Sequence, residues 1–148
     1  MDIIKAGIAD LDLIAPLFDA YRQFYEQDAE PEKVKAFLHT RILREESVIF
    51  LALTEGSREA MGFTQLYPSF SSVSMQRLWI LNDLFVDPKH RKKGVGTSLM
   101  NTARQLAEDT RSKGLMLETG KGNRHAQALY EKLGYKKEED YFVYNLKV

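Results

Sequence analysis

The sequence predicts an α/β (α+β) fold, with a mixed and mostly antiparallel sheet of six to seven strands flanked by about four helices. Segments with apolar residues at helical spacing alternate with short, β-branched segments typical of strands. The expected order of elements is β-α-α-β-β-β-α-β-α-β, which a sheet with helices on its faces accommodates. The length of 148 residues fits one domain. No internal repeat or linker interrupts it, so residues 1–148 are predicted to form a single domain.

The N-terminal third is expected to form one strand and two helices. Residues 3–6 are typical of a short strand, and Asp10 can cap the helix that follows. The apolar residues of that helix recur at spacings of three and four, which places them on one face: Leu11, Ile14, Phe18, Tyr21 and Tyr25. Pro31 suits the first turn of a second amphipathic helix, which extends to about residue 42.

Three consecutive strands are expected in the middle of the chain. Residues 48–54 and 61–67 are rich in apolar residues, and the polar turn between them makes them a hairpin. A polar loop at 69–74 leads into a long strand over 76–86, which Pro88 ends.

The last third is expected to contain two helices and two strands. A helix with apolar positions on one face begins near Val95 and ends before Gly114. A short strand at 115–119 follows, and then a helix that Asn123 can cap and Gly134 can end. Residues 141–146 are expected to form the final strand.

The composition argues against several classes of protein. Lys and Arg total 21, as do Asp and Glu, whereas nucleic-acid binding usually requires a basic surplus. There is no cysteine, which excludes disulfides, thiolate metal sites and a cysteine nucleophile, and the three histidines lack metal-ligand spacing. No apolar run approaches the ~20 residues that span a bilayer, and the N-terminus lacks a signal-peptide pattern. We expect a cytoplasmic protein with no metal, nucleic-acid or membrane partner.

A basic turn with two glycines lies between the long strand and the next helix. It reads Arg91, Lys92, Lys93, Gly94, Val95, Gly96 and Thr97. Glycines let backbone N–H groups approach an anion closely, and a helix N-terminus favours negative charge. The turn is therefore a candidate cradle for a pyrophosphate. By these residues alone, it could also be a plain strand-to-helix connection with solvated lysines or, over 89–93, a nucleic-acid-binding patch.

Asn82 and Asp83 interrupt an otherwise apolar strand. Side chains alternate along a strand, so the two residues face opposite sides of the sheet unless a bulge intervenes. Polar groups on a central strand are costly unless they are satisfied, so they need a reason. Asp83 could take a proton from an amine, which must lose one before it can attack. It could also pair with a neighbouring arginine or cap a loop, and both interpretations stay open.

Two segments resemble the signatures of one family. Residues 91–96 match the [QR]-x-x-G-x-[GA] signature of the GNAT superfamily of acetyl-CoA-dependent N-acetyltransferases, and residues 84–88 look like the strand end that precedes it. Residues 123–135 are similar to the family's second signature. The two signatures have the family's usual separation, and the order of elements agrees over nearly the whole chain. The stretch 81–86 looks closest to the polyamine-acetyltransferase-like and small histone-acetylating branch.

The resemblance implies a GNAT fold, whose sheet splays beside the fourth strand, and binding of acetyl-CoA as the acetyl donor. The backbone N–H groups of residues 91–97 would hold the pyrophosphate. The backbone of Leu84, Phe85 and Val86 would pair with the acetyl and pantetheine arm. Asn123 and Ala126 would belong to the opposite wall of the donor site. Asn123 also fits the simpler role of a helix cap.

The resemblance further implies direct transfer of the acetyl group to a primary amine in a ternary complex. Tyr130 would be the general acid that protonates the departing thiolate, and it would also contact the cofactor. Its shared helix face with Ala126 and Leu133 also fits a core tyrosine. Polyamine enzymes carry a Glu-Asp pair where this chain has Asn82-Asp83, so either Asp83 is the base, or water and the strand environment suffice. The alternative function is a CoA-binding regulatory module without turnover.

The acceptor, in this fold, approaches between the first two helices and the loop after the third strand. Candidate acceptor residues are Tyr21, Tyr25, Glu26 and Asn82. The acidic run over 26–32 would attract a cation, although such runs are usually solvated. We expect a small cationic amine, a polyamine-like molecule or a protein lysine as acceptor. The resemblance also implies a homodimer, for which the apolar segment 141–144 is a candidate interface.

Overall fold

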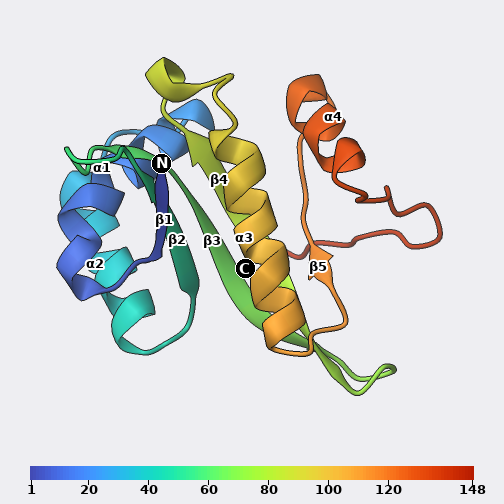
Figure 1. Cartoon of the computed structure of the whole chain (residues 1–148). Coiled ribbons are helices and arrows are strands. Elements are labelled where there is room, and N and C mark those ends of the chain that lie inside the picture. Colours follow the sequence, from blue (N-terminus) through green and yellow to red (C-terminus); the bar gives the residue numbers. More distant parts are fainter. The chain divides into compact units, whose positions relative to one another are not determined.

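The structure is a computed structural model that describes all 148 residues. The chain forms two compact units, Met1–Leu117 and Glu118–Val148, which are described separately below. Figure 1 gives the course of the chain and the labels of the elements.

The first unit contains a five-stranded sheet in the order β1-β2-β3-β4-β5. The strands are β1 (Asp2–Lys5), β2 (Val48–Leu53), β3 (Ala60–Ser71), β4 (Gln76–Val86) and β5 (Leu115–Met116). Neighbouring strands are antiparallel except for β4 and β5, which are parallel. This is the mixed, mostly antiparallel sheet that the order of elements predicts.

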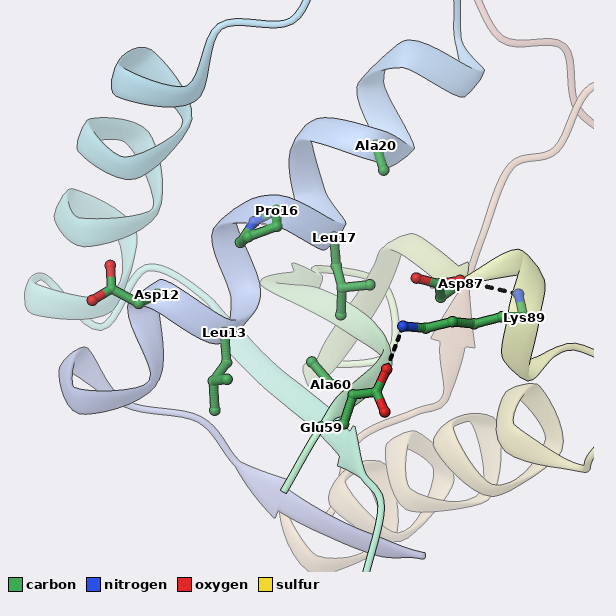
Figure 2. Close-up of a pocket in the computed structure, with 9 residues that line it drawn as sticks. All are labelled: Asp12, Leu13, Pro16, Leu17, Ala20, Glu59, Ala60, Asp87 and Lys89. Carbon is green, nitrogen blue, oxygen red and sulfur yellow. Dashed lines mark hydrogen bonds and ion pairs between the residues drawn. The ribbon is translucent and has the colours of Figure 1, made fainter. Parts of the chain in front are cut away.

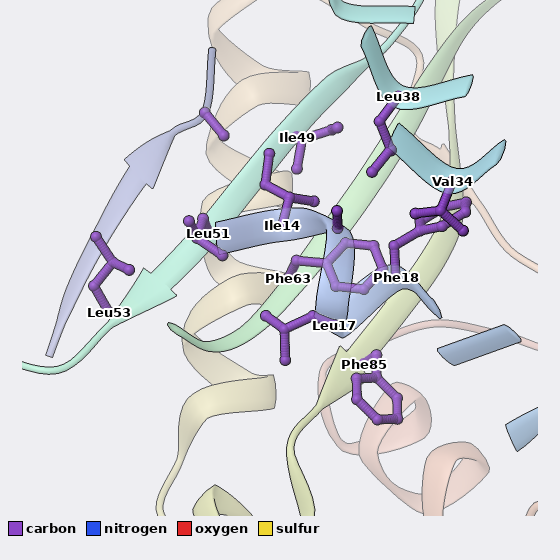
Figure 3. Packing of buried hydrophobic residues seen from close by; sticks show 12 residues of the cluster. Ile14, Leu17, Phe18, Val34, Leu38, Ile49, Leu51, Leu53, Phe63 and Phe85 are labelled. Carbon is purple, nitrogen blue, oxygen red and sulfur yellow. The ribbon is translucent and has the colours of Figure 1, made fainter. Parts of the chain in front are cut away.

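Two helices cover one face of this sheet, and a third covers the other (Figures 1 and 3). On the first face lie α1 (Leu11–Phe24) and α2 (Pro31–Leu43), and on the second lies α3 (Val95–Asp109). Pro31 occupies the first turn of α2, as expected. Asp10 precedes α1, but its carboxylate accepts a hydrogen bond from the Gly7 N–H and closes a short 3₁₀ turn instead of capping the helix.

The main apolar core fills the space between the sheet and the pair α1 and α2 (Figure 3). Its labelled members come from both helices and from three strands: Ile14, Leu17, Phe18, Val34, Leu38, Ile49, Leu51, Leu53, Phe63 and Phe85. Phe63 on β3 and Phe85 on β4 are cross-strand partners, so this part of the two central strands turns its odd-numbered side chains toward α1 and α2. That orientation decides which face of the sheet carries the candidate site.

The second unit contains the helix α4 (Arg124–Lys132). Asn123 caps its N-terminus, because the Asn123 Oδ1 accepts a hydrogen bond from the Ala126 N–H at 3.2 Å. Gly134 has a φ of 94°, and the N–H groups of Gly134 and Tyr135 donate to the carbonyls of Glu131 and Tyr130. These two bonds form a Schellman motif, so both predicted ends of this helix are confirmed.

The predicted strand count is too high, since the sheet has five strands and not six or seven. The segment 141–146 is rich in the aromatic and apolar residues typical of a strand but forms none. β5 covers only two residues of the predicted 115–119, and β3 extends through Ser71 into the predicted loop at 69–74. A strand is defined by its partner, and local sequence does not reveal where the ladder with that partner begins or stops.

No helix of the chain combines the length and the apolar character that crossing a bilayer requires. The predicted cytoplasmic location stays a prediction. No group of three or more His, Asp or Glu side chains is arranged to hold a metal ion.

Candidate active site

A bulge in β4 places Asn82 and Asp83. Gln65 on β3 pairs with Asp83, but the next residue, Leu66, pairs with Leu81, so Asn82 is passed over in the register. A bulge of this kind inserts one extra residue into a strand and redirects the side chains beside it. Asp83 is buried at 3% exposure, whereas Asn82 is exposed. The bulge thus coincides with Asn82 and Asp83, the two polar residues that interrupt the apolar sequence of this strand.

Two amide groups hold the Asp83 carboxylate. The Gln65 Nε2 donates to Oδ2 at 2.6 Å, and the Asn82 Nδ2 donates to Oδ1 at 2.9 Å. Burial raises the pKa of Asp83, and hydrogen bonds from Gln65, Asn82 and Tyr21 oppose that rise. The carboxylate is therefore not paired with an arginine and does not cap a loop, the two structural roles that the sequence left open.

Two tyrosines extend the polar cluster around Asp83. The Tyr21 hydroxyl of α1 donates to the Asn82 carbonyl at 3.3 Å, which joins the first helix to the bulge. Tyr67 of β3 is partly buried, and burial together with the nearby Asp83 charge raises its pKa to about 12. The positive charge of Arg41 and a hydrogen bond from Gln65 act in the opposite direction on that pKa.

Gln65 is not among the candidate residues from sequence, and Tyr67 enters only as the first residue of the loop expected opposite the acceptor residues. A signal for Gln65 was present, since it is a polar residue inside the apolar run of a central strand, as Asp83 is. Its meaning depends on the cross-strand register, which the bulge sets. Tyr67 carried no comparable signal, because a tyrosine is ordinary in a strand.

The strand segment after Asp83 has a ladder partner on one edge only. Leu84, Phe85 and Val86 pair with β3, whereas the ladder between β4 and β5 consists of Trp79 with Leu115 and Ile80 with Met116. This short parallel ladder corresponds to the predicted splay of the sheet beside the fourth strand. It leaves the backbone of 84–86 without a β5 partner.

The basic turn connects β4 to α3. Lys92 and Gly94 both have positive φ angles, 60° and 79°, and Gly94 occupies the N-cap position of α3. The helix ladder begins where the Ser98 N–H donates to the Gly94 carbonyl, so the N–H groups of Val95, Gly96 and Thr97 have no acceptor within the helix. These groups and the helix dipole suit an anion.

The cations of this turn differ in what they contact. The Arg91 guanidinium donates to the Val86 carbonyl at 3.0 Å and lies over the Phe85 ring, which ties the turn to the end of β4. The Lys93 ammonium donates to the Lys89 carbonyl. Arg91, Lys92 and Lys93 are all exposed at the surface of the turn.

Lys89 precedes the turn and belongs to a different feature, a cavity of about 250 Å³ (Figure 2). Its ammonium forms an ion pair with Glu59, which raises the pKa of Lys89 and lowers that of Glu59. The cavity is lined by residues of α1 and of the adjoining strand ends: Asp12, Leu13, Pro16, Leu17, Ala20, Glu59, Ala60, Asp87 and Lys89. None of the residues predicted for the active site lines it.

The candidate acceptor residues on α1 form an aromatic cluster. The Tyr25 ring meets the Tyr21 ring edge-on with centroids 5.1 Å apart, and Phe24 meets Tyr25 in the same way at 5.3 Å. Phe24, Tyr25 and Glu26 are exposed, and Glu26 has a φ of 63° directly after the helix end. Tyr21 therefore connects the exposed aromatic residues to the bulge through its contact with Asn82.

The acidic run after α1 is partly neutralised within the chain. Glu30 pairs with Arg22 at 3.0 Å and with Lys33 at 2.7 Å, and both cations lower its pKa. Glu26, Asp28 and Glu32 are exposed. The net negative charge of this segment is therefore smaller than its sequence indicates, because Arg22 and Lys33 pair with Glu30.

The remaining candidates lie in the second unit. Asn123 caps the N-terminus of α4, which is the simpler of its two expected roles. Its Oδ1 accepts the capping hydrogen bond, so its Nδ2 is the group that can donate to a ligand. Ala126 supplies the capped N–H. Tyr130 lies one helical turn later and contacts the Tyr135 ring, with centroids 6.0 Å apart.

Comparison with known proteins assigns the family. The model of the acetyltransferase (GNAT) family matches residues 14–135. An uncharacterized N-acetyltransferase of Bacillus subtilis, YhfO, is 47% identical over 148 residues, which cover 100% of this chain and 98% of that protein. A probable acetyltransferase of Haemophilus influenzae is 36% identical over 80% of each chain. The crystal structure of a probable acetyltransferase superposes with a TM-score of 0.96 at 41% identity, covering 100% of this chain and 98% of that one. The chain therefore belongs to the GNAT family of acetyltransferases.

Proposed function

We propose that this acetyltransferase moves the acetyl group of acetyl-CoA directly onto a primary amine. The observation that carries the proposal is the placement of Asp83, a buried carboxyl with a raised pKa, at a bulge directly before an unpaired strand edge. A carboxyl whose pKa is raised toward neutral is better suited to accept a proton near pH 7 than an ordinary one. The absence of cysteine fits direct transfer without a thioester on the enzyme.

The donor side of the proposed site fits acetyl-CoA in its residues. The N–H groups of Val95, Gly96 and Thr97 lack acceptors within α3, and they suit the negative pyrophosphate together with the charges of residues 91–93. The edge of Leu84, Phe85 and Val86, which has no β5 partner, can add the pantetheine arm as a strand would be added. Gly94 and the rest of the turn contribute backbone to the same cradle.

For the second unit, the proposal rests on the likeness of residues 123–135 to the second GNAT signature. Asn123, through its Nδ2, and Ala126 would contact the pantetheine amides. Tyr130 would supply the proton that the departing thiolate takes up. Asp83 would remove the proton of the attacking amine, directly or through a water molecule.

On the acceptor side, we propose that Tyr21, Tyr25, Glu26 and Asn82 border the amine. The contact of Tyr21 with the Asn82 carbonyl supports this grouping, as does the edge-on packing of Tyr25 on Tyr21. An ammonium group is attracted by aromatic faces and by a nearby carboxylate, and Tyr25 and Glu26 are both exposed. A small cationic amine, a polyamine-like molecule or a protein lysine would satisfy this chemistry.

The proposed reaction is tested by measuring free thiol after the full chain is mixed with acetyl-CoA and a panel of amines. The panel contains a polyamine, a simple alkylamine and a lysine-containing peptide, and mass spectrometry identifies the acetylated product. We expect amine-dependent thiol release that Asp83→Asn strongly reduces. Calorimetric binding of acetyl-CoA without thiol release for any amine would favour the alternative, a CoA-binding regulatory module.

We also propose that the chain forms a homodimer through the segment 141–144. Its four side chains are apolar or aromatic, and all are at least 72% exposed. Exposed apolar patches of this kind usually mark interaction sites. Light scattering of the purified chain should give twice the chain mass, and Phe142→Asp should shift it to the monomer. Val73→Asp, which changes an equally exposed valine in the turn between β3 and β4, is the matched control.

A further inference from the structure

Gln65 and Asp83 form a polar pair at the centre of the candidate site. Gln65 is completely buried and lies directly across from Asp83 in the β3–β4 register. Its Nε2 donates to the Asp83 carboxylate at 2.6 Å, which is shorter than the 2.9 Å bond from Asn82. Its Oε1 is buried and has no hydrogen-bond partner. Such an acceptor is rare in a folded protein, because its desolvation is not compensated.

The groups that face Asp83 are neutral. They are Tyr21 from α1, Gln65 and Tyr67 from β3, and Asn82 from β4, while Arg41 of α2 acts on Tyr67. None of the ion pairs of the chain includes Asp83. A cation here would hold the carboxylate in its ionised form, whereas amides and hydroxyls favour that form less strongly and can also bond to the protonated form.

A primary amide differs from a cation because it carries both a donor and an acceptor. In the orientation seen here, the Gln65 N–H group serves the ionised carboxylate. If the amide turns over about its last side-chain bond, Oε1 takes that place and can accept a hydrogen bond from a protonated Asp83. Such a rotation interchanges two groups of nearly equal size, so the packing around Gln65 can stay the same.

We propose that Gln65 is a positioning residue that satisfies Asp83 in both of its protonation states. This inference rests on the proposed function, in which Asp83 is the base. When Asp83 takes the proton of the attacking amine, its new O–H group donates to the Gln65 Oε1. When Asp83 releases that proton to water, the amide returns and its N–H group again binds the carboxylate. The unpartnered Oε1 is thus the acceptor for the second state.

The test compares three variants in the full chain. Gln65→Met keeps the length of the side chain but removes both hydrogen-bonding groups, and Gln65→Glu keeps the shape but adds a second carboxyl. Thr64→Val is the matched control, since Thr64 is equally buried on the same strand and its hydroxyl donates to the Asp83 backbone carbonyl, at 2.8 Å, and not to the carboxylate. The pKa of Asp83 is measured by carbon NMR of its labelled carboxyl, assigned with Asp83→Asn, and by the acidic limb of the pH profile of kcat/KM.

We expect Gln65→Met to raise the pKa of Asp83 by about one unit, because the variant loses the hydrogen bond to either form of the carboxyl and the bond to the charged form is the stronger of the two. Gln65→Glu should raise it further, because two carboxyls share one site. Thr64→Val should leave it unchanged. A purely structural role for Gln65 would lower the melting temperature of Gln65→Met without moving this pKa, and that result overturns the inference.

The NMR titration separates this inference from the proposed function. If the chain transfers no acetyl group but the Gln65 variants change the pKa of Asp83 as expected, the inference about Gln65 and Asp83 is confirmed and the proposed acetyl transfer is wrong. If transfer occurs and neither the titration nor the acidic limb responds to Gln65→Met, the function stands and the role of Gln65 is wrong.

Discussion

Tyr130 is the residue whose substitution most directly tests the acid half of the proposed reaction. Tyr130→Phe removes only the hydroxyl group, so the ring contact with Tyr135 should be kept. We expect kcat to fall by roughly 10²–10⁴-fold, the usual contribution of a positioned general acid, with little change in the affinity for acetyl-CoA. Steady-state kinetics and calorimetry measure the two effects, with Tyr141→Phe as the control. A rate equal to that of the wild type would remove Tyr130 from the mechanism.

At the same scale, the sequence predicts which residues are unusual better than it predicts what they contact. The break in the apolar run identifies Asn82 and Asp83 as polar groups in need of partners. Their partners follow from a register shift that places Gln65 opposite Asp83, and register is a property of two strands together. From the sequence alone, an arginine or a loop is an equally good partner for Asp83, whereas in the structure amide groups bind the carboxylate.

Among the elements, the N-terminus of α3 tests the donor site. Gly96→Glu places a carboxylate beside the N–H groups proposed to hold the pyrophosphate. A change of charge at a helix N-terminus is worth about 1–2 kcal/mol in favourable cases, so acetyl-CoA affinity should fall by about tenfold or more, once the added bulk is included. Calorimetry measures the affinity. Asn101→Glu, at an exposed position farther along α3, adds the same charge and should bind normally. Normal binding by Gly96→Glu would mean that the cradle lies elsewhere.

The helices were the more predictable elements because their signals are local. Periodicity and end residues such as Pro31, Asn123 and Gly134 act within one or two turns, and the structure confirms all three. The short strand β5 and the segment 141–146 show the opposite case. Their apolar patterns permit a strand, but only a partner along the whole segment creates one, and β5 pairs over two residues.

Across the whole molecule, the proposed chemistry draws on both units. The first holds Asp83, the open edge of β4 and the basic turn, and the second holds Asn123 and Tyr130. The prediction that residues 1–148 act as one domain stays a prediction, and the proposed function depends on it. The match to the family model covers residues 14–135, which belong to both units.

The stability of the whole chain should depend on pH in a way that Asp83→Asn removes. Burial raises the pKa of Asp83 in the folded state above its unfolded value of about 3.9. Between these two values, the folded state binds more protons than the unfolded state, so this group makes the free energy of unfolding fall as the pH rises. Above the raised pKa, the effect is complete and the pH dependence from this group ends.

The lowered pKa values of Glu30, Glu55 and Glu59 act in the opposite sense, because their contribution is lost as the pH falls. They are the same in both proteins, so the difference between wild type and Asp83→Asn isolates Asp83. Urea denaturation at a series of pH values should show the variant gaining stability relative to the wild type from about pH 4 upward, and then a plateau. A difference that does not change with pH would mean that Asp83 titrates alike in the folded and unfolded chains, and its suitability as a base would then have no thermodynamic support.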